Sequence, residues 1–192
     1  VYGHLAYFGQ PIYDSGAFCA DMLMSGSAEE NRGTVHLVRI ERDVKGLSDP
    51  SQERRRGFMD YLTAHFPETE VRNVVINPNN PEEAHKAMDD AFTAITGCPN
   101  VVTLNSRIYL VADYLREHGL KGWNVIGYDV LERNMTALKD GYVKYLIAQH
   151  SDRDAHDAVA VLTDFLILGK RPDHPDNFSS IDLLSRYNCR FY

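Results

Sequence analysis

Trp123-Asn124-Val125-Ile126-Gly127-Tyr128-Asp129 is a short, largely apolar run that ends in a glycine, a tyrosine and a carboxylate. Runs of this length that are rich in β-branched and aromatic residues predict a buried strand. We expect Gly127 to let the backbone turn, which places Tyr128 and Asp129 at the carboxyl end of that strand. In open α/β sheets, ligands bind at this end of the strands. The stretch therefore predicts a central strand and a place for a small ligand.

Strand and helix patterns alternate around this stretch, with short connections between them. Strands are predicted at about 5–8, 34–40, 71–76, 100–104, 123–127 and 142–148, helices at about 11–24, 51–66, 81–97, 106–118 and 131–139, and a polar loop at 41–50. Parallel strands need helical crossovers, so the pattern predicts a three-layer, doubly wound α/β fold with a mostly parallel sheet. Ser106 is expected to cap the helix that follows it. After residue 149 the alternation stops, and a long helix at 152–168 and a last strand at 178–184 follow.

Composition limits the function classes. The 192 residues carry a formal charge of −7, and 44% of them are hydrophobic, which is enough for a core. Nucleic-acid-binding domains carry basic patches, so this piece is not expected to bind DNA by itself. No apolar run approaches the roughly 18 residues of a membrane helix, and the first residues do not resemble a signal peptide. We expect a cytoplasmic protein in which Cys19, Cys98 and Cys189 are reduced thiols.

Polar side chains follow five of the predicted strands: Arg54, Asn79, Asn105, Asp129 and Gln149. Because parallel strands finish at one edge of a sheet, we expect these side chains to share one rim. Sugar hydroxyls donate and accept hydrogen bonds, and carboxylate, guanidinium and amide groups in a dry cleft satisfy both roles. The set therefore predicts a site for a small polyhydroxyl ligand. The alternative is that the Asn and Asp residues after strands form turns or cap helices, and that alternative is favoured for Asn79, which lies beside prolines.

Motifs of the common enzyme classes are absent. No GxSxG, GxxxxGK[ST], HExxH or GxGxxG pattern occurs, and His150 and His156 are six residues apart rather than the four of a helical metal pair. We therefore expect neither catalysis nor a cofactor or metal. Three consecutive helical positions face three directions, so one arginine of Arg54-Arg55-Arg56 is expected to reach the cleft while the others are solvated.

Five segments occur in an order and spacing that match a known family: 8–16, Arg54-Arg55-Arg56-Gly57-Phe58, Leu104-Asn105-Ser106, Val125-Ile126-Gly127-Tyr128-Asp129 and Ile147-Ala148-Gln149. On these segments the chain resembles the effector-binding domain of lactose-repressor (LacI) family transcription regulators, which is built on the periplasmic binding protein-like fold. The resemblance covers nearly all 192 residues.

The resemblance implies that Arg54, Asn105 and Asp129 contact a small carbohydrate-like effector, with Gln149 at the cleft or hinge. It implies an effector-binding domain fragment over residues 1–192, in which about 11–148 form the second α/β subdomain and about 152–192 belong or bridge to the first. Family members are homodimers that bind DNA through an N-terminal helix-turn-helix, which would precede Val1, and effector binding changes operator affinity.

Three functions follow from these expectations. The first is the ligand-sensing domain of a LacI-type regulator. The second is a periplasmic-type solute-binding protein of the same fold without a DNA-binding role. The third, a flavodoxin-like or Rossmann-like enzyme, is disfavoured because the phosphate-binding loops are missing.

The predicted helix at 152–168 carries Val159, Leu162, Phe165 and Leu166 on one side. The resemblance implies that this side packs on the first subdomain, most of which the chain lacks. Left exposed, it would form an apolar patch of a kind that soluble monomers avoid. We therefore expect the helix to fold back on the rest of the chain or to be buried in a dimer.

Overall fold

The computed structural model describes residues 4–40 and 50–192, so the polar loop expected at 41–50 lies outside the described residues except at its last position. The helices are α1 (Ile12–Ser25), α2 (Pro50–His65), α3 (Pro81–Phe92), α4 (Ile108–Glu117), α5 (Glu132–Asp140) and α6 (Ser151–Leu168). The strands are β1 (Tyr7–Gly9), β2 (Thr34–Ile40), β3 (Glu70–Ile76), β4 (Asn100–Val102), β5 (Asn124–Tyr128), β6 (Tyr145–Ala148), β7 (Asp176–Phe178) and β8 (Asp182–Leu184).

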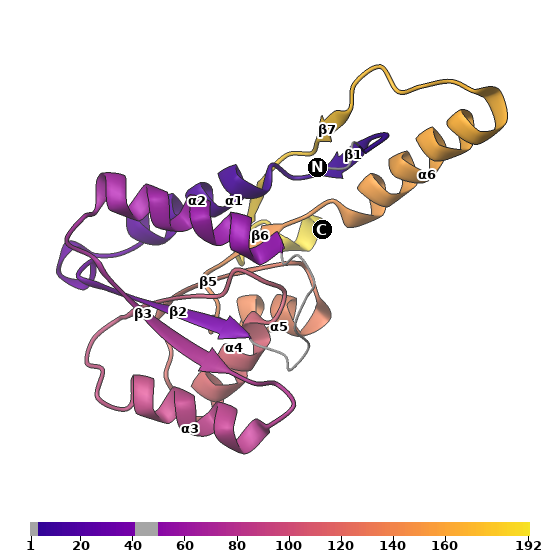
Figure 1. Ribbon diagram of the computed structural model, residues 1–192. Helices are drawn as coiled ribbons and strands as arrows, with labels where there is room; N and C mark the ends of the chain where they lie inside the picture. The colour runs from indigo at the N-terminus through magenta and orange to yellow at the C-terminus, as the bar shows by residue number, and fades with distance from the viewer. Residues whose placement is uncertain (1–3, 41–49) are drawn as a thin grey trace.

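The main sheet has the strand order β3-β2-β4-β5-β6-β8 within the described residues. Neighbours from β3 to β6 are parallel, and β8 is antiparallel to β6. Helices α1 and α2 cover one face of this sheet, and α3, α4 and α5 cover the other (Figure 1). The fold class predicted from the sequence, a three-layer α/β fold with a mostly parallel sheet, is confirmed.

Strand β5 is buried along its whole length because helices cover both of its faces. Val125 packs in the cluster with α3–α5, and Ile126 packs in the cluster with α1 and α2. Consecutive strand residues point to opposite faces, so a strand covered on both sides needs an unbroken apolar run. We expected Gly127 to turn the chain, but it lies inside β5. A Cβ there would lie 2.4 Å from Cβ of Ile108, so glycine is required for α4 to approach the strand.

A smaller unit extends away from the main sheet and consists of α6 and a two-stranded parallel sheet of β1 and β7 (Figure 1). Within residues 4–40 and 50–192, three chain segments cross between the two units. The first joins β1 to α1, the second joins β6 to α6, and the third joins β7 to β8. The subdomain boundaries expected at about residues 11–148 and 152–192 stay a prediction.

Several element boundaries differ from those expected. The single strand expected at 178–184 is two strands in different sheets, and the polar residues Ser179 and Ser180 cross between the sheets. Helix α3 ends at Phe92 rather than near residue 97. Just after that end, Ile95 N donates to Phe92 O, a bond between residues three apart that closes a turn. Ser106 does not cap α4. Asn105 turns the chain there instead, because its Oδ1 accepts from Arg107 N at 3.0 Å.

The cysteines form no disulfide, as expected: Cys19 and Cys189 are buried free thiols, and Cys98 is an exposed one. Burial raises the pKa of the Cys19 thiol to about 12, so it stays protonated. None of the described helices is long and apolar enough to cross a membrane.

Helices α1 and α2 cross with their backbones in contact through two glycines. A Cβ on Gly16 would lie 1.9 Å from the carbonyl oxygen of Arg54, and a Cβ on Gly57 would lie 2.0 Å from that of Tyr13. Any side chain at either position would force the helices apart. The two glycines therefore set how close α2, which carries Arg54, lies to α1.

We expect Gly16→Ala to destabilise the protein by about 1–3 kcal/mol, because the clash with Arg54 O outweighs the gain of about 1 kcal/mol that alanine has over glycine in a helix. Chemical denaturation measures the loss. Gly33→Ala is the matched control, since a Cβ there meets no atom within 4 Å, and its effect should stay within about 0.5 kcal/mol. Equal stability of Gly16→Ala and the parent protein would contradict the close crossing.

Helix α6 folds back on β1 rather than on the main sheet, so the first alternative is met for one side of the helix only. The other side is open to solvent, and the exposed fractions of Val159, Leu162 and Leu166 are 64%, 49% and 72%. Burial of this helix in a dimer stays a prediction.

We expect the 192-residue chain to self-associate through α6, because burying the exposed apolar side chains of this helix between two copies is favourable. Light scattering at increasing concentration measures the association. The double substitution Leu162→Glu and Leu166→Glu should abolish it, whereas Val75→Glu, at an exposed valine on β3, should not. A parent chain that stays monomeric at high concentration would refute the prediction.

Candidate functional site

The candidate site forms where β5 and β6 end side by side. These strands are parallel, with Tyr128 paired to Ile147, so the residues that follow them are neighbours. Gln149 Nε2 donates to Asp129 Oδ1, and Asp129 N donates to Ile147 O at 2.9 Å. The topology therefore brings Asp129 and Gln149 together, as a shared rim requires.

Arg54 joins this pair from α2. Its Nη1 donates to Leu104 O at 2.9 Å and its Nη2 donates to Gln149 Oε1 at 3.4 Å. The guanidinium lies over the ring of Tyr128, 4.1 Å from the ring centroid. Only 6% of Arg54 is exposed, whereas Arg55 is half-buried and Arg56 is exposed. Arg54 is thus the one buried arginine of the three, and the expectation that it reaches a ligand cleft stays a prediction.

Tyr128 supports the Arg54 guanidinium from beneath, a role that was not expected from the sequence. It is fully buried, and its hydroxyl donates to Ser15 O at 2.8 Å. Burial raises the pKa of Tyr128 well above its ordinary value, so the ring stays neutral beneath the Arg54 cation. Since Ser15 precedes Gly16, the crossing of α1 and α2 fixes both the ring and the guanidinium.

Asp129 adopts a left-handed backbone conformation, with φ at +70°. A non-glycine residue in this region is strained, although aspartate tolerates it better than most residues. Asn134, which is fully buried on α5, supports the turn. Its Nδ2 lies 3.0 Å from each of three carbonyl oxygens, those of Ser106, Tyr128 and Asp129. One carboxamide thus holds the end of β5 beside the loop that precedes α4.

Sequence reasoning missed Asn134, although a signal for it exists. Positions 134, 137 and 138 share one side of α5, and the other two are Ala137 and Leu138, which are also buried. A polar residue on the apolar side of a predicted helix needs buried partners, because an unpaired buried amide is costly.

The pKa of the Asp129 carboxyl is raised, and burial is the leading cause. The hydrogen bond from Gln149 and the charge of Arg54 act in the opposite direction and favour the carboxylate. Asp129 is therefore a half-buried acid whose charge depends on its two partners.

Asn105 lies beside this network. It follows Leu104, whose carbonyl accepts from Arg54, while its own side chain closes the turn before α4. Asn79 lies apart. It follows the edge strand β3, with β2 and β4 between it and β5, and it is exposed. Its N–H donates to Asn77 Oδ1 at 2.9 Å, which is the turn geometry that had been the alternative. A ligand-binding role for Asn79 remains a prediction without geometric support.

A hollow of about 580 Å³ opens next to the network. Its lining is Asp129, Val130, Leu131, Gln149, His150, Ser151, Asp152, Arg153 and Tyr192. Asp129 and Gln149 are part of this lining, and the first turn of α6 contributes Ser151, Asp152 and Arg153. In residues 4–40 and 50–192, no group of three or more His, Cys, Asp or Glu side chains could hold a metal ion.

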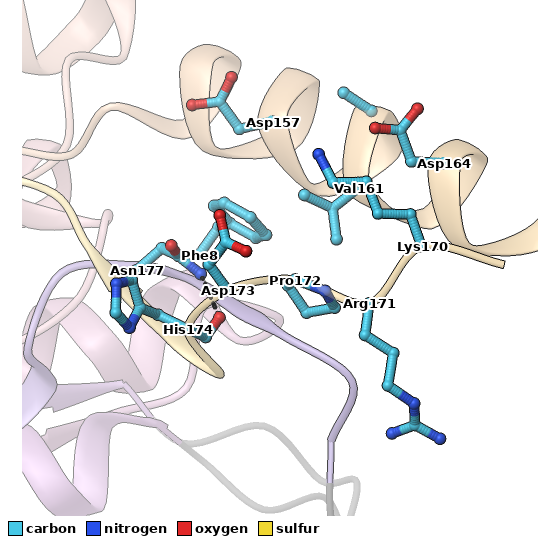
Figure 2. A pocket seen from close by; sticks show the side chains of 11 residues that line it. Phe8, Asp157, Val161, Asp164, Lys170, Arg171, Pro172, Asp173, His174 and Asn177 are labelled. Atoms are coloured by element: carbon cyan, nitrogen blue, oxygen red, sulfur yellow. Dashed lines mark hydrogen bonds between the residues drawn. The ribbon is translucent and has the colours of Figure 1, made fainter. Parts of the chain in front are cut away.

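A second hollow of about 340 Å³ lies between α6 and the β1–β7 sheet, and Figure 2 shows its lining, which includes Phe8, Asp164, Lys170 and His174. This hollow belongs to the smaller unit and shares no lining residue with the hollow beside Asp129. Its walls come from α6, the loop at residues 170–174 and the two short strands, and the opposite side of α6 is exposed. We therefore place the candidate site at Asp129 rather than here.

We expect Asn134→Asp to destabilise the protein by about 2–4 kcal/mol, because a carboxylate cannot donate to the three carbonyls and would face them with negative charge. Urea denaturation measures the loss. Asn80→Asp is the matched control. Asn80 caps α3 by accepting from Glu83 N, and aspartate keeps that acceptor, so its effect should stay within about 0.5 kcal/mol. Equal effects of the two substitutions would contradict the role given to Asn134.

Several solved structures share this architecture. A protein from Bacteroides fragilis that is proposed to be a LacI transcriptional regulator is 32% identical to this chain, with a TM-score of 0.88, and the match covers 98% of this chain and 64% of that one. A solute-binding protein of an ABC transporter from Burkholderia graminis, solved with D-arabinose, is 21% identical, with a TM-score of 0.81 and coverage of 99% and 65%. A sugar-binding protein of an ABC transporter from Bacillus halodurans is 16% identical, with a TM-score of 0.78 and coverage of 97% and 66%.

The last two likenesses show the fold alone. This chain spans less than two thirds of the length of each of the three proteins. No curated protein matches the chain in sequence. The family described as periplasmic binding protein domain matches residues 2–171, which is most of the chain. The chain therefore belongs to the periplasmic binding protein domain family.

Proposed function

We propose that this chain is the ligand-sensing domain of a LacI-type transcription regulator and that its effector is a small sugar or sugar derivative. The observation that carries the proposal is the contact of Arg54, Gln149 and Asp129 at the carboxyl end of the parallel sheet. The likeness to the Bacteroides fragilis protein, at 32% identity, supports the regulator reading.

The network has hydrogen-bonding capacity for hydroxyl groups. Gln149 stands between Arg54 and Asp129, with its oxygen toward the guanidinium and its nitrogen toward the carboxylate. The two charged groups are therefore bridged by an amide rather than paired directly. Arg54 Nε is buried and has no hydrogen-bond partner within the described residues. Asp129 and Gln149 line the hollow, so their carboxylate and amide groups suit the donor–acceptor pairs of a sugar, while Arg54 holds Gln149 from behind.

The hollow beside Asp129 also suits a sugar. Its volume of about 580 Å³ is within the usual range for small-molecule sites, and it combines polar groups with the apolar Val130 and Leu131. The sugar class rests on this chemistry, because the D-arabinose complex among the solved structures is only 21% identical to this chain. The proposal includes no catalytic activity and no cofactor.

In this proposal, the effector binds between the two units, shifts their relative arrangement and changes the DNA affinity of a helix-turn-helix that lies outside this chain. The regulator would be a cytoplasmic homodimer. A periplasmic-type sugar-binding protein is the second candidate, and the ABC transporter proteins of the same fold favour it. The coding sequence upstream of Val1 separates the two, because it encodes about 50 residues of helix-turn-helix in one case and a signal peptide in the other.

A thermal-shift screen of mono- and disaccharides on the full-length protein tests the site. A sugar at 100 times its Kd should stabilise the protein by about 2.7 kcal/mol. Asp129→Ala should abolish this shift while the protein stays folded, because Asp129 supplies the carboxylate that accepts from the hydroxyls. If the sugar stabilised Asp129→Ala as strongly as the parent protein, Asp129 would not be part of the binding site.

Two further variants sharpen the result. Asp173→Ala, in the hollow of Figure 2, should keep the full shift, and its loss would move the site to that hollow. Asn79→Ala should also keep the shift, because Asn79 lies apart from the network.

A further inference from the structure

The three chain segments that cross between the two units meet at one side chain, Gln10. It lies on the first crossing, between β1 and α1, and only 3% of it is exposed. Its Nε2 donates to Ala148 O, at the start of the second crossing, at 2.6 Å. The same Nε2 donates to Ser180 O, on the third crossing, at 2.8 Å.

Further bonds gather at this point. The carbonyl oxygen of Gln10 accepts from the Tyr7 hydroxyl at 2.9 Å, and Ser179 N donates to Gly9 O at 3.0 Å. The first crossing is thus bonded to each of the other two, and Gln10 is the one residue among these that reaches both.

The orientation of the Gln10 amide follows from its surroundings. Two carbonyl oxygens face its nitrogen, and its Oε1 is buried with no partner within the described residues. The flipped amide would set Oε1 against the oxygens of Ala148 and Ser180, which is unfavourable. Position 10 therefore requires a side chain that donates two hydrogen bonds, and the size of glutamine alone is not enough.

The bond to Ala148 matters for the site because Gln149 is the next residue. We propose that Gln10 is a positioning residue which fixes the second crossing, so that the Gln149 carboxamide stays between Arg54 and Asp129. The inference concerns the site assigned under the proposed function, yet its test uses no ligand. It can therefore fail while sugar binding holds, and it can hold if no sugar binds.

The first test uses the parent protein and NMR. The carboxamide protons of Gln10 should exchange with solvent at least roughly tenfold more slowly than those of an exposed glutamine such as Gln52. Exchange at the rate of a free amide would overturn the proposal. This measurement needs no substitution, so it decides even if variants fail to fold.

The second test replaces Gln10 by methionine, which keeps the length and volume but loses the donor. The readout is the midpoint of the Asp129 carboxyl titration, followed by NMR. Loss of the bond from Gln149 should raise the pKa of Asp129, because that bond favours the carboxylate. The charged groups on the walls around Asp129 are Arg54, His150, Asp152 and Arg153, and none of them is changed.

Tyr7→Phe is the matched control, since it removes a hydrogen bond to Gln10 O but leaves the carboxamide intact. It should leave the Asp129 midpoint where it is in the parent. In Gln10→Met, an unchanged midpoint would overturn the proposal. A lowered midpoint would overturn it as well, because admission of water relieves the burial that raises this pKa and indicates general loosening rather than lost positioning.

Discussion

A cation buried at the carboxyl end of the sheet is the constraint around which this structure is organised. Taking a guanidinium out of water costs several kcal/mol unless its new surroundings compensate. Arg54 receives that compensation from a carbonyl, an amide oxygen and the face of Tyr128. A hydrogen bond to a charged group is worth about 1.5–3 kcal/mol and a desolvated cation–π contact about 2 kcal/mol, so together these contacts are of the right size. The backbone contact at Gly16 and Gly57 matters because it holds α2, which carries Arg54, against α1, whose Ser15 carbonyl accepts from the Tyr128 hydroxyl.

The sequence was most informative for features that depend on neighbouring residues or on the regular spacing of side chains in helices and strands. The apolar run of β5 and the strand–helix alternation predict the parallel sheet, and the sheet in turn predicts that residues after β5 and β6 are neighbours. The spacing of residues 54–56 on a helix predicts that one arginine points inward. These inferences need only the period of a helix and the direction of parallel strands.

The remaining features depend on partners that are distant in the chain. Asn134 has two partners nearby, the carbonyls of Tyr128 and Asp129, but the third carbonyl, that of Ser106, is 28 residues away, and only the fold brings it beside the others. The strand expected at 178–184 reads as continuous in sequence, and only pairing with β1 and β6 divides it into β7 and β8. Gly127 was read as a turn, whereas the real constraint is the approach of Ile108. Gln10 gave no local signal, because the carbonyls that it bonds are 138 and 170 residues away.

Strand β3 forms one margin of the main sheet and pairs on one side only, with β2, within the described residues. A margin of this kind offers unpaired backbone groups to any extended segment that approaches, which is a common start of aggregation. Glu70 and Arg72 are exposed on this strand and form an ion pair at 2.7 Å. An incoming strand would have to desolvate both charges, so this pair protects the margin against unwanted sheet extension.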